Sequence, residues 1–426
     1  MISLSFGAGI GYTSAVLKEL EKHYSEDQIS WIATGTLLGS FLGPAMWSQI
    51  TPRIGPKKSA LVTGVPMLIS WCLLLNIANF WCVMGGRVVK GIAMGALTAT
   101  VPHYVSETAE DALRGTLGSI MVLTFNIGTL LVYGLGGFLD GFNLALVCAV
   151  IPIIFMIVFL PCPESPIYLL HNKRVDQGRL NLRRLRYPRD TTDELAIIST
   201  KTEVQEARWA DVFKKKAARK TVGISIVMFA IQQISGIIAL LSYVGDIFER
   251  AGGSIDPTTG SCIVGAVQVL GSLVGILLIE RAGRRVIMVS SCVTMALSHG
   301  LLGYALMPDS NTPGWLPVTC LSIFMIGYAM GAAGAPYVIM NELSTPSMRP
   351  MVATINMVFM GCFTFLITKT YTDMIRLLSE SGVFWLYASG CAAGAVFTFF
   401  FLPETAGKSN ASIQEELEGR RTKQTA

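Results

Sequence analysis

The sequence predicts an all-α membrane protein in which twelve transmembrane helices form two pseudo-symmetric six-helix bundles. Three observations predict this fold: a membrane-like composition, recurring apolar stretches, and charged motifs that repeat between the two halves. Of the 426 residues, 52% are hydrophobic and only 14% are charged, and the mean hydropathy is +0.54. A soluble chain would carry roughly 25% charged residues. The composition therefore excludes a disordered chain and a secreted disulfide scaffold, and it disfavours a soluble enzyme.

Twelve apolar segments along the chain have about the length of a membrane span. They lie near residues 2–17, 29–50, 59–79, 81–105, 115–138, 142–161, 222–248, 261–280, 286–306, 315–340, 351–374 and 383–402. The first segment is shorter than the roughly 20 residues that a span needs. This is the pattern of an N-terminally truncated or alternatively started chain.

The distribution of basic residues predicts the orientation of the spans. The gaps on one side, together with the C-terminal tail, hold 26 of the 33 Lys and Arg residues, and the opposite gaps hold five. The positive-inside rule then places both termini in the cytoplasm. Because the bias falls on alternate loops, it explains the net charge of +5 better than a nucleic-acid surface does. We expect no nucleic-acid partner.

Four regions follow from this topology. Residues 1–161 form an N-terminal six-helix bundle, and residues 222–402 form a C-terminal six-helix bundle. Residues 403–426 form a cytoplasmic tail. The cytoplasmic linker, 162–221, holds 14 basic and 8 acidic residues. Its spacing of leucines among arginines favours short amphipathic helices under the membrane, with a solvated linker as the alternative.

An internal repeat relates the two halves. Glu107 precedes Arg114 by seven residues after the fourth span, and Glu342 precedes Arg349 by the same distance after the tenth. Both pairs are offset by 235 residues. The repeat therefore predicts that the chain is a duplicated six-helix unit.

Further charged residues repeat at the same ends of the spans. They are Glu164 and Glu404, in Pro-Glu pairs offset by 240 residues, and Glu280, Arg281, Arg284 and Arg285, which correspond to the basic loop around Gly55. Carboxylate–guanidinium pairs can latch an interface and still break when it opens. We expect a cytoplasmic gate or latch, and helix capping by the same charges is the alternative.

No catalytic or metal chemistry can be read from the sequence. The nine cysteines form no CxxC pair, and the four histidines are scattered without a Cys or acid at ligand spacing. No nucleophile–base pair or phosphate-binding loop occurs. We expect no enzyme activity, no catalytic residue, no metal and no cofactor.

A set of motifs carries a family resemblance. They are Arg87-x3-Gly91-x3-Gly95, Pro102-x-Tyr104-x-x-Glu107, Pro163-Glu164-Ser165-Pro166, Gln232-Gln233-Ile-Ser235-Gly236, Glu280-Arg281-Ala-Gly283-Arg284-Arg285 and Pro403-Glu404-Thr405. In this order they resemble the sugar porter family of the major facilitator superfamily, most closely facilitated trehalose and facilitative glucose transporters. The resemblance implies the major facilitator fold and alternating-access transport of a sugar, a hexose or trehalose.

The resemblance also implies the substrate contacts. The matching positions are Gln232 and Gln233 on the seventh span, with Gln268 on the eighth and Tyr337 on the tenth, where the family has an aromatic platform. Tyr243 falls at a gate position. Amide side chains suit a polyol, because each offers donors and an acceptor to adjacent hydroxyls.

Several family positions are altered. Val122, Ile238, Gly361 and Cys362 stand where the family has polar or aromatic contacts to glucose. Two alternatives therefore stay open. One is a non-transporting sugar sensor or degenerate paralogue, and the other is a transporter of a less polar solute.

The driving force is predicted from the first span. Proton-coupled members of the family carry an Asp there, facing the Arg of the fourth span, whereas this chain has Thr13 opposite Arg87. We expect uniport, with Arg87 a structural intramembrane charge.

The expected partners are the sugar and the lipid bilayer, and the oligomeric state is not predicted. We expect a multi-pass protein of the plasma membrane, although the residues themselves do not distinguish that membrane from an internal vesicle.

Overall fold

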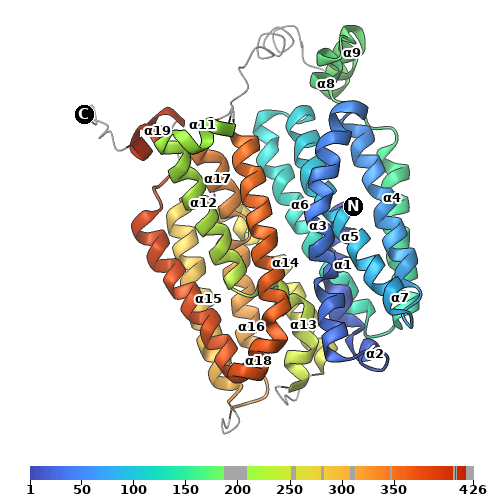
Figure 1. The fold of residues 1–426 in the computed structure, drawn as a ribbon, viewed down its shortest axis with the longest axis vertical. Coiled ribbons are helices and arrows are strands. Elements are labelled where there is room, and N and C mark those ends of the chain that lie inside the picture. Colours follow the sequence, from blue (N-terminus) through green and yellow to red (C-terminus); the bar gives the residue numbers. More distant parts are fainter. Residues whose placement is uncertain are drawn as a thin grey trace. The chain divides into compact units, whose positions relative to one another are not determined.

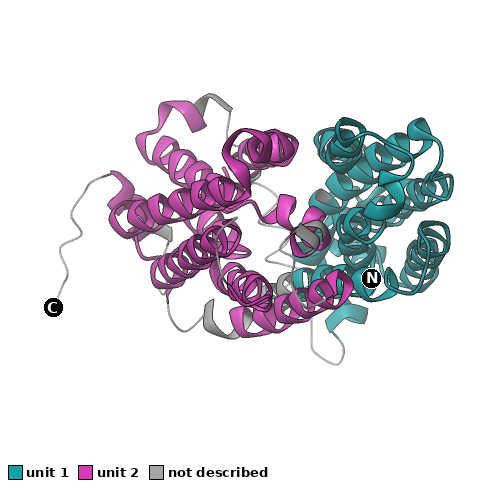
Figure 2. Cartoon of the chain, turned by 90° about the horizontal axis from the view of Figure 1, so that it is seen from below, with its two compact units in different colours: residues 1–204 teal, residues 205–426 magenta. Residues whose placement is uncertain are grey.

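The computed structural model describes residues 1–186, 209–250, 256–279, 283–307, 312–345, 348–405, 408 and 410–418, and these residues form helices and no strand (Figure 1). The chain divides into two compact units, Met1–Val204 and Gln205–Ala426 (Figure 2). Each unit has its own buried apolar core.

The first unit consists of six long helices, two short helices that follow them, and one short helix after the first. They are α1 (Ile2–Ala15), α2 (Leu17–Glu21), α3 (Glu26–Ile54), α4 (Pro56–Leu74), α5 (Phe80–Thr108), α6 (Asp111–Leu135), α7 (Gly141–Phe159), α8 (Pro166–His171) and α9 (Val175–Arg186). Side-chain caps mark where several of them begin, α3, α5 and α7 among them. Ser25, Asn79 and Asp140 accept hydrogen bonds from first-turn N–H groups of α3, α5 and α7.

Small residues let the helices of this unit approach closely. A Cβ atom at Gly91 of α5 would overlap the carbonyl oxygen of Thr36, and one at Gly39 of α3 would overlap that of Val88. The glycine spacing after Arg87 is thus a helix-packing feature, typical of membrane bundles.

The second unit is arranged as a second helical bundle with three interruptions. Its helices are α11 (Trp209–Lys214), α12 (Lys216–Ile234), α13 (Ile237–Arg250), α14 (Pro257–Ile279), α15 (Arg284–Ala305), α16 (Leu316–Gly327), the π-helix η1 (Tyr328–Ala332), α17 (Ala335–Leu343), α18 (Arg349–Phe401) and α19 (Asn410–Glu418). The seventh predicted span is broken between α12 and α13, and the tenth contains η1. A residue with φ of 63°, Ser379, bends α18.

The helices correspond to the predicted spans. Eight helical segments among the described residues are long and apolar enough to cross a membrane. The predicted spans at 2–17, 59–79 and 115–138 coincide with α1, α4 and α6. Those at 351–374 and 383–402 lie on either side of the bend in α18. The predicted all-α architecture is therefore confirmed.

The predicted linker contains short helices at both ends. α8 and α9 pack against each other in the first unit, and Arg186 of α9 donates to the carbonyl oxygen of Thr108 at 2.8 Å. Leu182 of α9 is buried. Residues 187–208 lie outside the described part of the chain.

Candidate functional site

The two adjacent glutamines of the second unit lie at the end of α12, just before the helix breaks. Both are buried. Nε2 of Gln233 donates to Oε1 of Gln232 at 3.1 Å, and Oε1 of Gln233 accepts from the hydroxyl of Thr364 at 2.8 Å. Thr364, on α18, was not predicted as a site residue, because a threonine in an apolar span gives no signal of its own. The structure therefore links the seventh and eleventh spans through Gln233.

Gln232 bonds in the other direction, to the interrupted tenth span. Its Nε2 donates to the carbonyl oxygens of Ala332 at 2.7 Å and Ala333 at 3.3 Å. In a regular helix Ala332 would accept from residue 336, but Pro336 has no N–H. Tyr337 N–H bonds to Gly334 instead, at 3.2 Å. Gln232 thus supplies the donor that the proline removes.

The two amides consequently differ in what they can offer a ligand. The amide nitrogen of Gln232 is directed at two backbone carbonyls, and its oxygen accepts from Gln233. An amide has two N–H donors and two acceptor lone pairs. Gln233 uses one donor and one lone pair within the described residues, so one of each is left for a polar ligand.

The aromatic candidates lie on the same unit. The Tyr337 hydroxyl donates to the thioether sulfur of Met360 at 3.4 Å, and its ring packs edge-on against Phe229, with centroids 4.9 Å apart. A thioether is a weak acceptor, so the Tyr337 hydroxyl can exchange this contact for a stronger hydrogen bond. Tyr243, on α13, is buried and stacks on Tyr371 with ring centroids 5.2 Å apart. Gln268, on α14, is also buried.

Arg87 of α5 is buried in the core of the first unit. It donates to three backbone carbonyl oxygens: those of Gly9 at 2.6 Å, Ile32 at 3.0 Å and Ala33 at 3.3 Å. The hydroxyl of Thr13 on α1 makes no hydrogen bond among the described residues. The guanidinium therefore ties α1 and α3 to α5 through groups that do not titrate.

A second buried basic residue lies one turn further along α5. Lys90 is fully buried, its Nζ makes no hydrogen bond among the described residues, and it lies 3.0 Å from the centroid of the Trp71 ring. We did not predict a role for Lys90, although a lysine inside an apolar span is a signal in itself. An ammonium over an aromatic face is stabilised by the ring quadrupole.

Three of the predicted latch residues of the second unit, Arg284, Glu342 and Glu404, are connected with one another. Arg284 at the start of α15 pairs with Glu342 of α17, with Nη2 and Oε1 2.9 Å apart and both side chains partly exposed. The second oxygen of Glu342 accepts from the hydroxyl of Thr405 at 2.5 Å. Nε of Arg349 donates to the carbonyl oxygen of Asn341 at 3.0 Å.

Glu404 caps the first turn of α15. Its carboxylate accepts from the backbone N–H groups of Arg284 at 3.0 Å and Arg285 at 3.1 Å. Gly283, just before the helix, has φ of 83°, and a Cβ there would lie 2.8 Å from the carboxylate. A carboxylate at a helix N-terminus is stabilised by the exposed N–H groups and the helix dipole.

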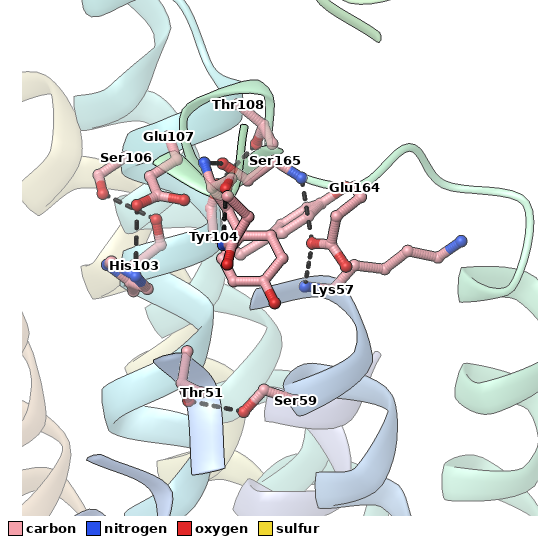
Figure 3. A network of polar contacts seen from close by, with 12 residues as sticks. Thr51, Lys57, Ser59, His103, Tyr104, Ser106, Glu107, Thr108, Glu164 and Ser165 are labelled. Atoms are coloured by element: carbon pink, nitrogen blue, oxygen red, sulfur yellow. Dashed lines mark hydrogen bonds and ion pairs between the residues drawn. The ribbon is translucent and has the colours of Figure 1, made fainter. Parts of the chain in front are cut away.

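The first unit contains the same arrangement (Figure 3). Glu164 accepts from the backbone N–H of Lys57 at 2.8 Å at the start of α4, and Gly55 before it has φ of 93°. A Cβ at Gly55 would lie 2.7 Å from the Glu164 carboxylate. The repeated Gly and Pro-Glu elements of the sequence are thus one structural device, present in each unit.

The remaining latch candidates are less connected. Glu107 lies 3.3 Å from Nε2 of His103 one turn earlier on α5. Arg114 falls within α6, but its side chain is outside the described part of the structure, as are Glu280 and Arg281.

The chain matches known sugar transporters over nearly its whole length. Residues 8–417 match the family described as sugar (and other) transporter. The facilitated trehalose transporter Tret1 of Bombyx mori is 31% identical, over 97% of this chain and 84% of that relative. Tret1 of Culex quinquefasciatus is 30% identical, over 98% and 84%.

A solved structure shows the same fold. The partially occluded, inward-open xylose transporter XylE from E. coli superposes with a TM-score of 0.82 at 19% identity, covering 96% of this chain and 97% of that one. The fold and the sequence matches together define a multi-pass membrane transporter with the major facilitator fold. The chain belongs to the sugar (and other) transporter family.

Proposed function

We propose that this chain carries a sugar, a hexose or trehalose, across the membrane by uniport and alternating access. The observation that carries the proposal is the Gln233 amide, which is buried, fixed by Thr364 and Gln232, and keeps one donor and one acceptor for a ligand. That pairing fits adjacent hydroxyls of a polyol. Relatives named as facilitated trehalose transporters support this substrate class.

Within the proposed site, Gln233 contacts the sugar directly. Tyr337 contributes its hydroxyl when the weak bond to Met360 is exchanged for one to the sugar. Gln268 and Tyr243 are further contacts in the proposal. The bonds of Gln232 to Ala332 and Ala333 favour a different role for it, that of holding the interrupted tenth span in place.

Uniport is supported by the surroundings of Arg87. Its guanidinium donates to the backbone carbonyl oxygens of Gly9, Ile32 and Ala33, and α1 contains no Asp or Glu. A proton-coupled step would need a titrating group at this position. The proposal therefore expects uptake that follows the sugar gradient and is unaffected by a protonophore.

The proposal extends to topology and gating. Both termini lie in the cytoplasm, the protein resides in the plasma membrane, and the four regions are residues 1–161, 162–221, 222–402 and 403–426. The cluster of Glu342 with Arg284 forms part of the cytoplasmic latch, because a partly exposed ion pair is strong enough to close it and weak enough to release it. The basic loops support this orientation.

Counterflow in proteoliposomes tests the function. Vesicles containing the purified protein are loaded with unlabelled trehalose or glucose and diluted into labelled sugar. We expect transient accumulation of label for the transported sugar, with no dependence on an imposed proton gradient. Binding without accumulation would support a sugar sensor instead, and counterflow with apolar solutes but no sugar would support the less polar substrate.

A further inference from the structure

The break in the seventh span directly follows the two glutamines. α12 ends at Ile234, Gly236 has φ of 73°, and α13 begins at Ile237. Residues with a side chain rarely adopt this φ. Space excludes a side chain as well, because a Cβ on Gly236 would lie 2.5 Å from the ring of Tyr387. The sequence therefore fixes a hinge at this point.

The break leaves one backbone carbonyl outside both helices. The hydrogen-bond ladder of α13 starts with Leu240 N–H donating to Gly236 at 2.9 Å, so the carbonyl of Ser235 precedes it. Nε2 of His299, on α15, lies 3.0 Å from that oxygen. Because a carbonyl only accepts, Nε2 carries the proton and donates.

The imidazole has no other polar contact in the described structure. His299 is fully buried, and its Nδ1 has no hydrogen-bond partner there. Its ring packs against Phe324 and Tyr387, with centroid separations of 4.4 and 5.9 Å. Packing thus holds the ring in place, and its single directional bond is to the hinge.

Many of the contacts that α13 makes are apolar or aromatic. Its buried side chains include Leu240, Val244 and Ile247, and Tyr243 stacks on Tyr371. Apolar contacts have no preferred direction, so they do not by themselves set the angle of the helix. The bond from His299 fixes the angle at its base.

We propose that His299 is a positioning residue that holds α13 at the Ser235–Gly236 hinge and so controls how often this gate segment opens. The hinge lies two residues from Gln233, so movement of α13 changes access to the proposed sugar contact. This consequence for transport rests on the proposed function. The hinge itself does not.

Hydrogen–deuterium exchange of the purified full-length chain tests the hinge without any sugar. His299→Leu removes the donor, and His299→Gln keeps an amide donor. We expect backbone exchange over residues 236–245 to rise about fivefold to tenfold in His299→Leu, the change that loss of one hydrogen bond produces. Exchange in α5 should stay as in the wild type, and His299→Gln should restore most of the protection.

A control variant and a replacement variant keep the test decisive. Tyr387→Phe removes a hydroxyl that has no hydrogen-bond partner in the described residues, so it should leave exchange unchanged. If the His299→Leu protein cannot be purified in folded form, His299→Asn replaces it. The Asn amide is too short to reach the carbonyl of Ser235. The proposal would be overturned if hydrogen exchange over residues 236–245 were unchanged in the variant that cannot bond to Ser235. It would also be overturned if exchange rose equally in every helix of the second unit.

The transport arm separates positioning from structural damage. In counterflow, His299→Leu should change the maximal exchange rate about fivefold, with KM within roughly twofold of the wild type. A change in KM alone would overturn the gating role. If the wild-type chain carries no sugar, the proposed function fails, and the exchange experiment still decides whether His299 holds the hinge.

Discussion

The amide nitrogen of Gln232 takes the place of the N–H that Pro336 lacks. The proline leaves the carbonyl of Ala332 without its helical donor, and Gln232 donates to it at 2.7 Å. One side chain of the seventh span therefore stabilises the irregular backbone of the tenth. Its neighbour Gln233 bonds to Gln232 and Thr364 and keeps one donor and one acceptor that no hydrogen bond among the described residues uses.

Gln232→Ala should destabilise the protein more than it weakens sugar binding. The substitution leaves the buried carbonyl of Ala332 and the partly buried carbonyl of Ala333 without this donor, which costs about 2 kcal/mol in the free energy of unfolding. Thermal unfolding in detergent measures the loss. Gln49→Ala, at an exposed position of α3, is the matched control and should have little effect. Equal stability of the two variants would contradict the role assigned to Gln232.

Lys90→Met should stabilise the folded protein. Burial of an ammonium without hydrogen bonds costs several kcal/mol, and the contact with Trp71 offsets about 2 kcal/mol of this. We expect a gain of about 1–3 kcal/mol in the free energy of unfolding. Lys58→Met, at an exposed position, should change it little. A Lys90→Met protein that is less stable, or folded but inactive, would show that the buried ammonium has a function.

Gly283→Ala and Gly55→Ala should destabilise their units by similar amounts. Both glycines have positive φ, and a methyl group at either would press on the capping carboxylate. We expect a loss of about 1–3 kcal/mol for each, measured by unfolding. Gly223→Ala is the control, because a Cβ at that helical position meets no atom within 4 Å. If only one of the two variants were destabilised, the caps would not be equivalent.

Glu342→Gln should shift the protein toward the inward-open state and slow the exchange of sugar across the membrane. The variant loses the ion pair with Arg284 while it keeps an acceptor for Thr405. Labelling of a cysteine engineered on the extracellular side reports the shift and should slow about threefold, as expected for a partly exposed pair. Unchanged labelling would argue against the latch.

The sequence predicted the positions of the helices because long apolar runs are visible in composition alone. It placed the bend at Ser379 between two spans, but it did not predict the break within the seventh span or the π-helix within the tenth. The positive φ of Gly236 goes with what packs beside it, because the ring of Tyr387 occupies the space that a side chain would need. Such contacts join residues more than a hundred positions apart.

The site was predicted in outline. The resemblance singled out the glutamine pair, but the division of roles between Gln232 and Gln233 depends on Pro336 and Thr364, which lie in other helices. Lys90 and His299 were not assigned a role. A lysine inside an apolar span is a signal, but the contact of Lys90 with Trp71 and that of His299 with Ser235 depend on residues in other helices. The repeated Gly and Pro-Glu elements were recognised as a duplication, and the structure adds their role as helix caps.

The most direct test of the account is the KM for uptake of labelled trehalose and glucose in cells that lack their own transporters, measured for the wild type and Gln233→Ala at equal surface expression. We expect saturable uptake of at least one sugar, with KM raised roughly tenfold in Gln233→Ala because a polar contact to a sugar hydroxyl is lost. The proposed function would be contradicted if Gln233→Ala showed saturable uptake with the same KM as the wild type. It would also be contradicted if the wild type took up neither sugar.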